Sequence, residues 1–222
     1  LFTIIFYPYL WDDPIRNFLQ IFSILSNFDI GIFNFYLGNY ISAESLPWHY
    51  SLVWLFVTTP IFYLFLFFIG ITFILTRFFS RLIKIDHNNS YKDLWRGNKE
   101  LQDLLHLFIF FIPIFSIIIL HSTLYDGWRH LYFIYPSFLM VSLSGLNIII
   151  IKFFKNKKLI PIILSLILII PTFTWMIKNH PHQYVFFNSI FKNNYDKYFT
   201  MDFWGVSNFN AMMYVAQNMK AT

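Results

Sequence analysis

The sequence predicts an all-α integral membrane protein, and three observations lead to this prediction. Hydrophobic residues make up 57% of the 222 residues and charged residues only 12%, about half the charged content of a soluble domain. The apolar residues come in runs of about twenty, the length that an α-helix needs to cross a bilayer. The charged residues lie between these runs. We therefore expect a polytopic helix bundle with about four full membrane spans and the end of another.

The first 49 residues are expected to lead into this bundle. Residues 1–8 are apolar with no basic region ahead of them, so they are predicted to be the end of a membrane helix rather than a signal peptide. Residues 9–49 are predicted to form an outer loop. In it, Asp12-Asp13-Pro14 and the apolar periodicity that follows predict a short amphipathic helix on the membrane surface. Gly38-Asn39 signals the turn of a small hairpin within 29–42.

Residues 50–178 contain the four predicted spans, each a long apolar run that includes a proline. Neighbouring helices and water tolerate such prolines in a membrane, although they usually bend the helix. The spans are predicted at about 51–77, 104–120, 131–151 and 159–177. The final segment, 179–222, is again polar and aromatic and is predicted to lie outside the bilayer. A helix is expected near its end, from Asn208 to Met219.

The distribution of charge predicts the orientation of the bundle. The loops between spans one and two and between spans three and four carry ten of the sixteen basic residues but only four of the eleven acidic residues. By the positive-inside rule these basic loops are predicted to be cytoplasmic. The polar loops then share the periplasmic or extracellular face.

One of these polar loops is the stretch Tyr125-Asp126-Gly127-Trp128-Arg129-His130, between two apolar runs. Charged residues at that depth are unfavourable unless they are paired, so a functional site is the default interpretation. The guanidinium of Arg129 is a planar fork of donors that suits a phosphate, and lipid phosphates lie at this depth. The alternative is that Arg129 pairs with Asp126 and extends to the interface. Asp126 suits a capping or pairing role better than that of a general base.

Histidines and aromatic residues gather on the same predicted face. His49 and His121 suit a site and also suit polar rings at the headgroup level. His180 and His182 supply only two ligands, so a metal site would need a third from elsewhere. The chain has no cysteine. We therefore assign no metal-binding residue and leave a divalent metal open as a cofactor. Tyr184, Phe186, Phe187 and Trp204 suit either stacking on sugar rings and prenyl chains or anchoring of their loops.

Several stretches, taken in order, resemble landmarks of one group of membrane enzymes. They are Leu46-Pro47-Trp48-His49-Tyr50 with Val57-Thr58-Thr59-Pro60, the 125–130 stretch with Tyr135-Pro136, residues 180–188, and Asp202-Phe203-Trp204-Gly205. The pattern is similar to GT-C type glycosyltransferases that use polyprenyl-phosphate sugars, such as protein O-mannosyltransferases (dolichyl-phosphate-mannose-protein mannosyltransferase-like) and the aminoarabinose transferases of lipid A. The resemblance covers nearly the whole chain. It departs at His182 and Phe203, where tyrosine is expected.

The resemblance implies an inverting hexosyl or pentosyl transferase of a bacterial inner (plasma) membrane. Such an enzyme moves a sugar from a polyprenyl-phosphate donor to a protein or glycolipid acceptor at the outer face, in contact with membrane lipid and without nucleic acid. It implies a C-terminal fragment whose catalytic acid lies outside this chain. On this basis Arg129 and His130 are expected to bind the carrier phosphate. The residues expected to line the same cavity are Asp126, Trp128, His49, His180, Tyr184, Asp202 and Trp204.

Two other classes stay open at this point. A lipid-linked substrate transporter or flippase would also be polytopic, basic on the inside and rich in prolines, although charged residues would be expected nearer the membrane midplane. A non-catalytic membrane assembly subunit would keep the fold without the chemistry.

Overall fold

The computed structural model describes residues 6–26, 31–83, 95, 97–154, 159–191 and 194–218. Among these residues, four helical segments are long and apolar enough to cross a membrane. They are α4 (Ile61–Ile83), α5 (Gly97–Leu120), α6 (Tyr135–Phe154) with the preceding 3₁₀ helix η2 (Arg129–Ile134), and α7 (Leu159–Lys178). At a rise of about 1.5 Å per residue, helices of 20 to 24 residues are about 30–36 Å long, which matches a hydrocarbon core of about 30 Å. The four helices indicate an integral membrane protein.

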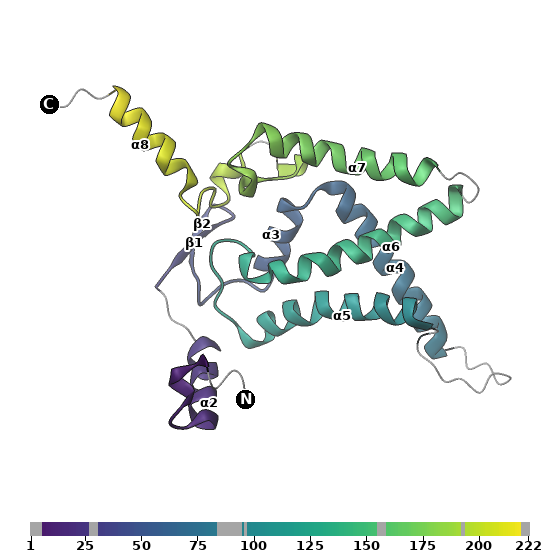
Figure 1. Cartoon of the computed structure of the whole chain (residues 1–222), viewed down its shortest axis with the longest axis horizontal. Helices are drawn as coiled ribbons and strands as arrows, with labels where there is room; N and C mark the ends of the chain where they lie inside the picture. Colours follow the sequence, from purple (N-terminus) through teal and green to yellow (C-terminus); the bar gives the residue numbers. More distant parts are fainter. Residues whose placement is uncertain are drawn as a thin grey trace.

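The helices run back and forth, so the polar segments collect at two opposite ends (Figure 1). One end, called here the hairpin end, carries the two-stranded sheet, the short helix α3 (Tyr50–Thr58) and the turn before η2. The other end, called here the ion-pair end, holds two salt bridges between α4 and α5. Arg77 lies 2.9 Å from Asp103, and Arg81 lies 2.6 Å from Glu100.

The first predicted span is not one continuous helix, which corrects the prediction of 51–77. Helix α3 ends at Thr58, the backbone is extended at Thr59 (φ −104°, ψ 137°), and α4 begins only at Ile61. The residue before a proline avoids the α conformation, and proline itself has no N–H to donate. Pro60 therefore separates a short buried helix from the membrane-crossing one.

The other three predicted spans lie within long apolar helices, and several helix ends, including that of α4, differ from the prediction. Helices α4 and α5 continue past the predicted limits at the ion-pair end, to Ile83 and back to Gly97. The salt bridges between them explain this, because Arg77 and Arg81 of α4 find carboxylate partners on α5. Pro136 lies at the first turn of α6, where η2 gives way to α-helix within the third candidate span. A proline is well tolerated at that position because the first N–H groups of a helix have no intrahelical partner.

Helices α4 and α6 form the closest contact in the bundle, and two glycines make it possible. A Cβ atom placed on Gly70 would lie 2.1 Å from the carbonyl oxygen of Val141. A Cβ atom placed on Gly145 would lie 2.1 Å from the carbonyl oxygen of Leu66. Small residues at such a crossing let the two backbones approach closely, which is a main source of helix association in lipid. This contact places α6 and the turn before it against α3 and α4.

The predicted hairpin is present, with its turn one residue earlier than expected. Strands β1 (Phe33–Tyr36) and β2 (Asn39–Ser42) are antiparallel, and Tyr36 pairs with Asn39. The turn residues are Leu37 and Gly38, with φ of 50° and 82°. A two-residue hairpin turn whose twist matches that of the strands needs a positive φ at both of its residues. Gly38 adopts a positive φ without strain.

Three other segments lie around the bundle. Helix α2 (Pro14–Ser26) begins where predicted, and the carboxylate of Asp13 accepts a 3.1 Å hydrogen bond from the N–H of Arg16. Helix α8 (Val206–Asn218) matches the helix expected near the C-terminus and projects away from the bundle (Figure 1). The membrane helix predicted for residues 1–8 falls mostly outside the described residues.

Candidate functional site

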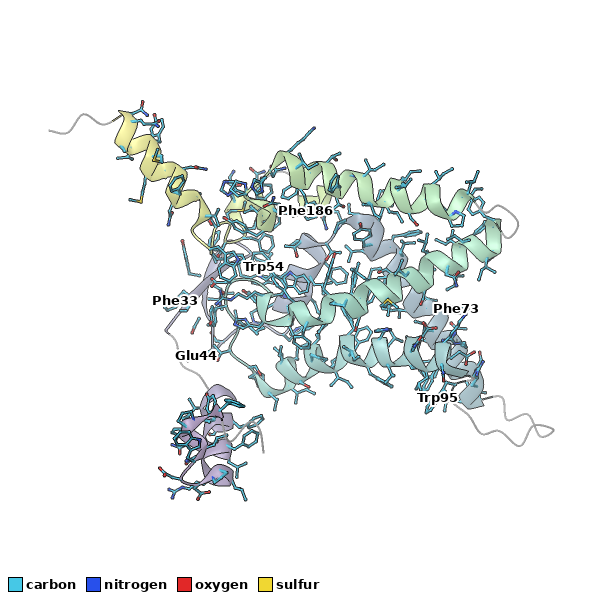
Figure 2. All side chains as sticks on the ribbon, viewed as in Figure 1. Phe33, Glu44, Trp54, Phe73, Trp95 and Phe186 are labelled. Atoms are coloured by element: carbon cyan, nitrogen blue, oxygen red, sulfur yellow. The ribbon has the colours of Figure 1, made fainter. Side chains whose placement is uncertain are left out.

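The hairpin end contains a pocket of about 380 Å³ whose walls come from three parts of the chain. Figure 2 places Trp54 of α3 and Phe186 of the C-terminal segment at this end, and Phe73 and Trp95 at the opposite end. Most of the lining is aromatic, with a few polar groups among the rings, as is usual for ligand sites. The lining residues are Trp54, Thr58, Asp126, Gly127, Trp128, Tyr132, Tyr135, Gln183, Tyr184, Phe186 and Phe203.

The turn that forms one wall of this pocket has a left-handed backbone at two successive residues. Asp126 has φ 54° and Gly127 has φ 77°. Glycine adopts this conformation readily, whereas a non-glycine residue there is strained and needs support from its surroundings. The support for Asp126 comes from Asn34 of the hairpin, which accepts a hydrogen bond from its N–H.

Asn34 of β1 and Tyr50 of α3 hold the backbone of the turn. The side-chain oxygen of Asn34 accepts hydrogen bonds from the N–H of Asp126 (3.0 Å) and from the hydroxyl of Tyr50 (3.1 Å), and its amide donates to the carbonyl of Leu124 (3.0 Å). The hydroxyl of Tyr50 in turn accepts from the N–H of Gly127 (3.1 Å). Asn34 and Tyr50 are both buried, and burial raises the pKa of Tyr50 above its usual range. The hairpin therefore fixes the turn.

Trp128 is anchored to α3 by its indole N–H. That group donates a 2.9 Å hydrogen bond to the hydroxyl of Thr58, which itself donates to the carbonyl of Trp54 at 2.7 Å. The ring of Trp128 also packs edge-on against Tyr132, with centroids 5.0 Å apart. The indole N–H of Trp128 and the hydroxyl of Thr58 are therefore both hydrogen-bonded in the wall of the pocket.

Arg129 is held at the edge of the pocket by three neighbours. Its Nη1 lies 3.3 Å from the carboxylate of Asp126, so the pairing expected from the sequence is present. Its Cζ lies 4.3 Å from the centroid of the Tyr125 ring and 5.2 Å from that of Trp204, which are cation–π distances. No hydrogen bond from Nε or Nη2 is present within the described part of the chain. A guanidinium has five N–H donors, so Arg129 keeps donors for a ligand.

The C-terminal segment forms another wall of the pocket, and its lining residue Tyr184 binds Asp202. The hydroxyl of Tyr184 donates a hydrogen bond to the carboxylate of Asp202. That carboxylate also accepts from the hydroxyl of Ser207 and from the backbone N–H groups of Val206 (3.0 Å) and Ser207 (2.9 Å), so it caps the N-terminus of α8. The bonds from Ser207 and Tyr184 hold the pKa of Asp202 well below its usual range. Partial burial, with the bond to Asp202, raises the pKa of Tyr184 to about 12.

Asn188 joins this segment to the break between α3 and α4. Its side-chain amide donates to the carbonyls of Phe56 (2.5 Å) and Thr59 (3.0 Å), and its backbone N–H donates to the carbonyl of Val57 (2.8 Å). Pro60 leaves carbonyls at this point without helical partners, and buried carbonyls need partners. Asn188 is buried and supplies them.

A second pocket, of about 430 Å³, adjoins the first, and Phe186 lines both. It lies between the start of α4, the C-terminal half of α7 and the C-terminal segment, and most of its lining is apolar. Helix α7 contributes Leu168, Pro171, Thr172 and Trp175, and the start of α4 contributes Pro60, Ile61 and Phe62. An apolar hollow between two helices that are long and apolar enough to cross a membrane is suited to an apolar chain.

The structure brings together some of the residues that the sequence singled out and separates others. Asp126, Trp128 and Tyr184 line the first pocket. Arg129, Trp204 and Asp202 lie next to lining residues, as described above. His130 packs edge-on against Tyr125 with ring centroids 4.6 Å apart, and His180 contacts the lining residue Gln183 at 2.7 Å.

His49 lies apart from this group. Its Nδ1 is 2.7 Å from the hydroxyl of Tyr36, on the hairpin, and it does not line the first pocket. Burial raises the pKa of Tyr36 to about 12, so this hydroxyl stays protonated at neutral pH. Among the described residues, no group of three or more His, Cys, Asp or Glu side chains lies close enough together to hold a metal ion.

The sequence interpretation missed the residues that position the site. Asn34 is a single polar residue within an apolar stretch, Thr58 is one of two threonines before Pro60, and Asn188 is the last residue of an aromatic cluster. A buried polar residue must find a hydrogen-bond partner, so an isolated Asn among aromatic residues was the available signal. The sequence does not show which distant backbone groups it binds.

The fold and the site define a helical integral membrane protein with an aromatic pocket at one end of its bundle and an arginine at the pocket's edge. Comparisons with protein-family models, with curated proteins and with solved structures gave no match.

Proposed function

We propose that this chain is part of a GT-C type glycosyltransferase that binds a polyprenyl-phosphate sugar at the hairpin end of the bundle. The observation that carries the proposal is the position of Arg129. Its guanidinium lies at the edge of an aromatic pocket, at the end of a membrane-crossing helix, and keeps donors free for a ligand among the described residues. A phosphate at the membrane surface would meet that guanidinium, and the aromatic walls suit a sugar ring.

The second pocket supports a lipid-linked donor in particular. It is mostly apolar, it adjoins the first pocket at Phe186, and it lies between α4 and α7. A prenyl chain in this hollow would remain within the apolar part of the bilayer while its phosphate reached Arg129. A soluble sugar nucleotide would have no use for such a hollow.

The charge pattern supports the placing of this site on the outer face. The loops that begin and end at the ion-pair end carry most of the basic residues, which favours a cytoplasmic location for that end. The hairpin end, with Arg129 and the pocket, would then face the periplasm or the exterior of a bacterial inner membrane.

The two acidic residues nearest the pocket have structural partners. Asp126 pairs with Arg129, and Asp202 caps α8 and accepts from Tyr184. A general base would need a carboxylate that is open to the acceptor. This supports the view that the catalytic acid residue of the enzyme lies outside these 222 residues, and that Arg129 stabilises the phosphate as it leaves.

A transporter is the main rival, because broken membrane helices often bind ions in transporters. The break between α3 and α4 is of this general kind. Its freed carbonyls, however, are hydrogen-bonded by Asn188 and are not left open for an ion. This contact favours the transferase over the transporter.

The proposal is tested by measuring the binding of a polyprenyl phosphate to the purified chain in detergent micelles. We expect Arg129→Ala to weaken binding about tenfold to a hundredfold, the range for a charge-assisted contact, and Arg129→Lys to restore it in part because lysine lacks the planar fork. Lys178→Ala, at the end of α7, is the matched control. Unchanged binding by the Arg129→Ala protein, or equal binding of a polyprenol without phosphate, would overturn the proposal.

A further inference from the structure

Helix α2 and the 3₁₀ helix before it form a small unit of their own. The 3₁₀ helix η1 (Pro8–Leu10) packs against α2 (Pro14–Ser26), and Leu10 is buried. The side-chain amide of Asn17 on α2 donates a 2.7 Å hydrogen bond to the carbonyl of Tyr9 on η1. In Figure 1 this unit lies beside the hairpin end and away from the helices of the bundle. It is therefore held together by its own contacts.

One face of α2 is apolar and open. Four large apolar side chains recur at the spacing of a single helical face, and each is more than half exposed. They are Ile15, Phe18, Leu19 and Phe22. Arg16 and Gln20 lie on the other side of the helix and are also exposed. Helix α2 thus presents an apolar face and a polar face to its surroundings.

The exposure of this apolar face equals that of a membrane-crossing helix in the same chain. Phe18 is 58% exposed, as are Phe62 and Phe65 of α4, a helix long and apolar enough to cross a membrane. Apolar rings are unfavourable in water and favourable in the acyl region of a bilayer. A helix with one apolar and one polar face meets both needs when it lies in the plane of the membrane surface.

The connection between α2 and the hairpin limits how far α2 can move from the bundle. Seven residue steps separate the end of α2 at Ser26 from the start of β1 at Phe33, which gives a reach of at most about 25 Å. Strand β1 belongs to the hairpin end, where α5 also ends (Figure 1). The apolar face of α2 can therefore reach the bilayer surface at that end without any further partner.

The charge of the unit gives little attraction to anionic lipids. Residues 6–26 contain one basic residue, Arg16, and two acidic residues, Asp12 and Asp13. Surface helices that bind anionic lipids through their charge carry several Lys or Arg residues. The burial of apolar side chains is therefore the main force that would bring α2 to the membrane.

We propose that η1 and α2 form an interfacial anchor, with the exposed apolar face of α2 inserted below the lipid headgroups at the hairpin end. The sequence predicted a helix on the membrane surface, and the structure identifies the face that enters the lipid and shows the helix packed on η1. The anchor inserts equally into neutral and anionic membranes, because its driving force is apolar. It does not depend on the glycosyltransferase activity proposed for the pocket.

The test is electron paramagnetic resonance of the spin-labelled full chain in lipid nanodiscs. The chain has no cysteine, so Leu19→Cys and Gln20→Cys place one label on the apolar face and one on the polar face. We expect the label at position 19 to lie about 5–10 Å below the headgroup boundary, accessible to oxygen and protected from a water-soluble nickel complex. The label at position 20 is the matched control and should be accessible to the nickel complex.

Two comparisons test the driving force. The depth of the label at position 19 should be the same in phosphatidylcholine as in a mixture with phosphatidylglycerol. Phe18→Gln combined with Phe22→Gln should return this label to water, because half of the apolar face is lost. Glutamine favours the helix at least as well as phenylalanine, so this change is not explained by loss of α2. The melting temperature of the bundle should stay unchanged.

Three results would overturn the proposal. The label at position 19 could be open to the nickel complex, which would place the face in water. It could be protected from both reagents, which would mean that a second copy or another protein covers the face. It could be inserted only when anionic lipid is present, which would make charge the driving force. Arg129→Ala should leave the depth unchanged, so failure of the proposed function and failure of the anchor are distinguishable.

Discussion

The backbone N–H of Asp126 donates a 3.0 Å hydrogen bond to the side-chain oxygen of Asn34, 92 positions earlier in the chain. The same side chain also binds Leu124 and Tyr50, and Asn34, Leu124 and Tyr50 are all buried. A hairpin outside the bundle thereby determines the conformation of the turn that carries Arg129. The contacts that position the site and hold the bundle together can be tested by altering four residues.

Asn34→Leu should destabilise the protein by about 2–3 kcal/mol, because it leaves a buried N–H, a buried carbonyl and a hydroxyl without their partner. It should also weaken polyprenyl-phosphate binding, since the turn loses its support. Equilibrium unfolding in micelles and the binding assay measure the two effects. Asn39→Ala, at an exposed position of the same hairpin, is the control. A variant with normal stability and binding would show that the turn holds its conformation without the hairpin.

Asn188→Ala should reduce stability by about 1–3 kcal/mol, because the carbonyls of Phe56 and Thr59 lose a buried donor. Asn188→Asp should be no better, since a carboxylate cannot donate to a carbonyl. Unfolding midpoints in micelles provide the comparison, with Asn218→Ala on the exposed face of α8 as control. If Asn188→Asp behaved like the original protein, water rather than this side chain would be satisfying the break.

Gly145→Ala should separate α4 from α6, because the added methyl group would lie 2.1 Å from the carbonyl oxygen of Leu66 and 2.9 Å from the nitrogen of Gly70. Overpacking of this kind destabilises by about 1–3 kcal/mol. The loss is measured as a lower unfolding midpoint in micelles. Leu143→Ala alters a side chain of the same helix that is 54% exposed, and it should have a much smaller effect. Equal effects of the two substitutions would contradict the close crossing.

Acid should release α8 from the site. The pKa of Asp202 is depressed in the folded chain, so its contribution to stability is present above the unfolded pKa of about 4 and is lost as the pH falls below that value. The chain has no cysteine, so a fluorophore on Asn218→Cys reports on α8 alone. Its anisotropy should fall between about pH 4 and pH 2, as the pH drops from the unfolded pKa towards the depressed folded pKa.

Asp202→Asn should give low anisotropy of this label at both pH values, because the amide cannot accept the same set of hydrogen bonds as a carboxylate. Asp196→Asn, in the same segment, should behave like the original protein. The prediction fails if the anisotropy is independent of pH in the original protein and unaffected by Asp202→Asn.

Composition and apolar run length were enough to predict the bundle, since lipid requires long apolar helices with all backbone groups paired. The same local signals located the start of α2 at Asp13-Pro14 and the hairpin around Gly38. The break at Pro60 was visible as a proline, but its effect was underestimated. Whether a proline bends or ends a helix depends on whether other groups bind the freed carbonyls, and here Asn188 does so from 129 residues away.

The residues of the site also fall into those that the sequence singled out and those that it did not. Arg129, Asp126, Trp128 and Tyr184 stood out in the sequence because charged and aromatic residues at the end of an apolar run are conspicuous. Their supports, Asn34 and Thr58, did not stand out, and His49 proved to belong to the hairpin. The sequence by itself determined that this is a helical membrane protein and located the four helices of its described part that are long and apolar enough to cross a membrane, because these depend on local hydrophobicity. Only the tertiary structure decided which polar groups meet around Arg129, because a hydrogen bond between distant residues depends on how the helices pack.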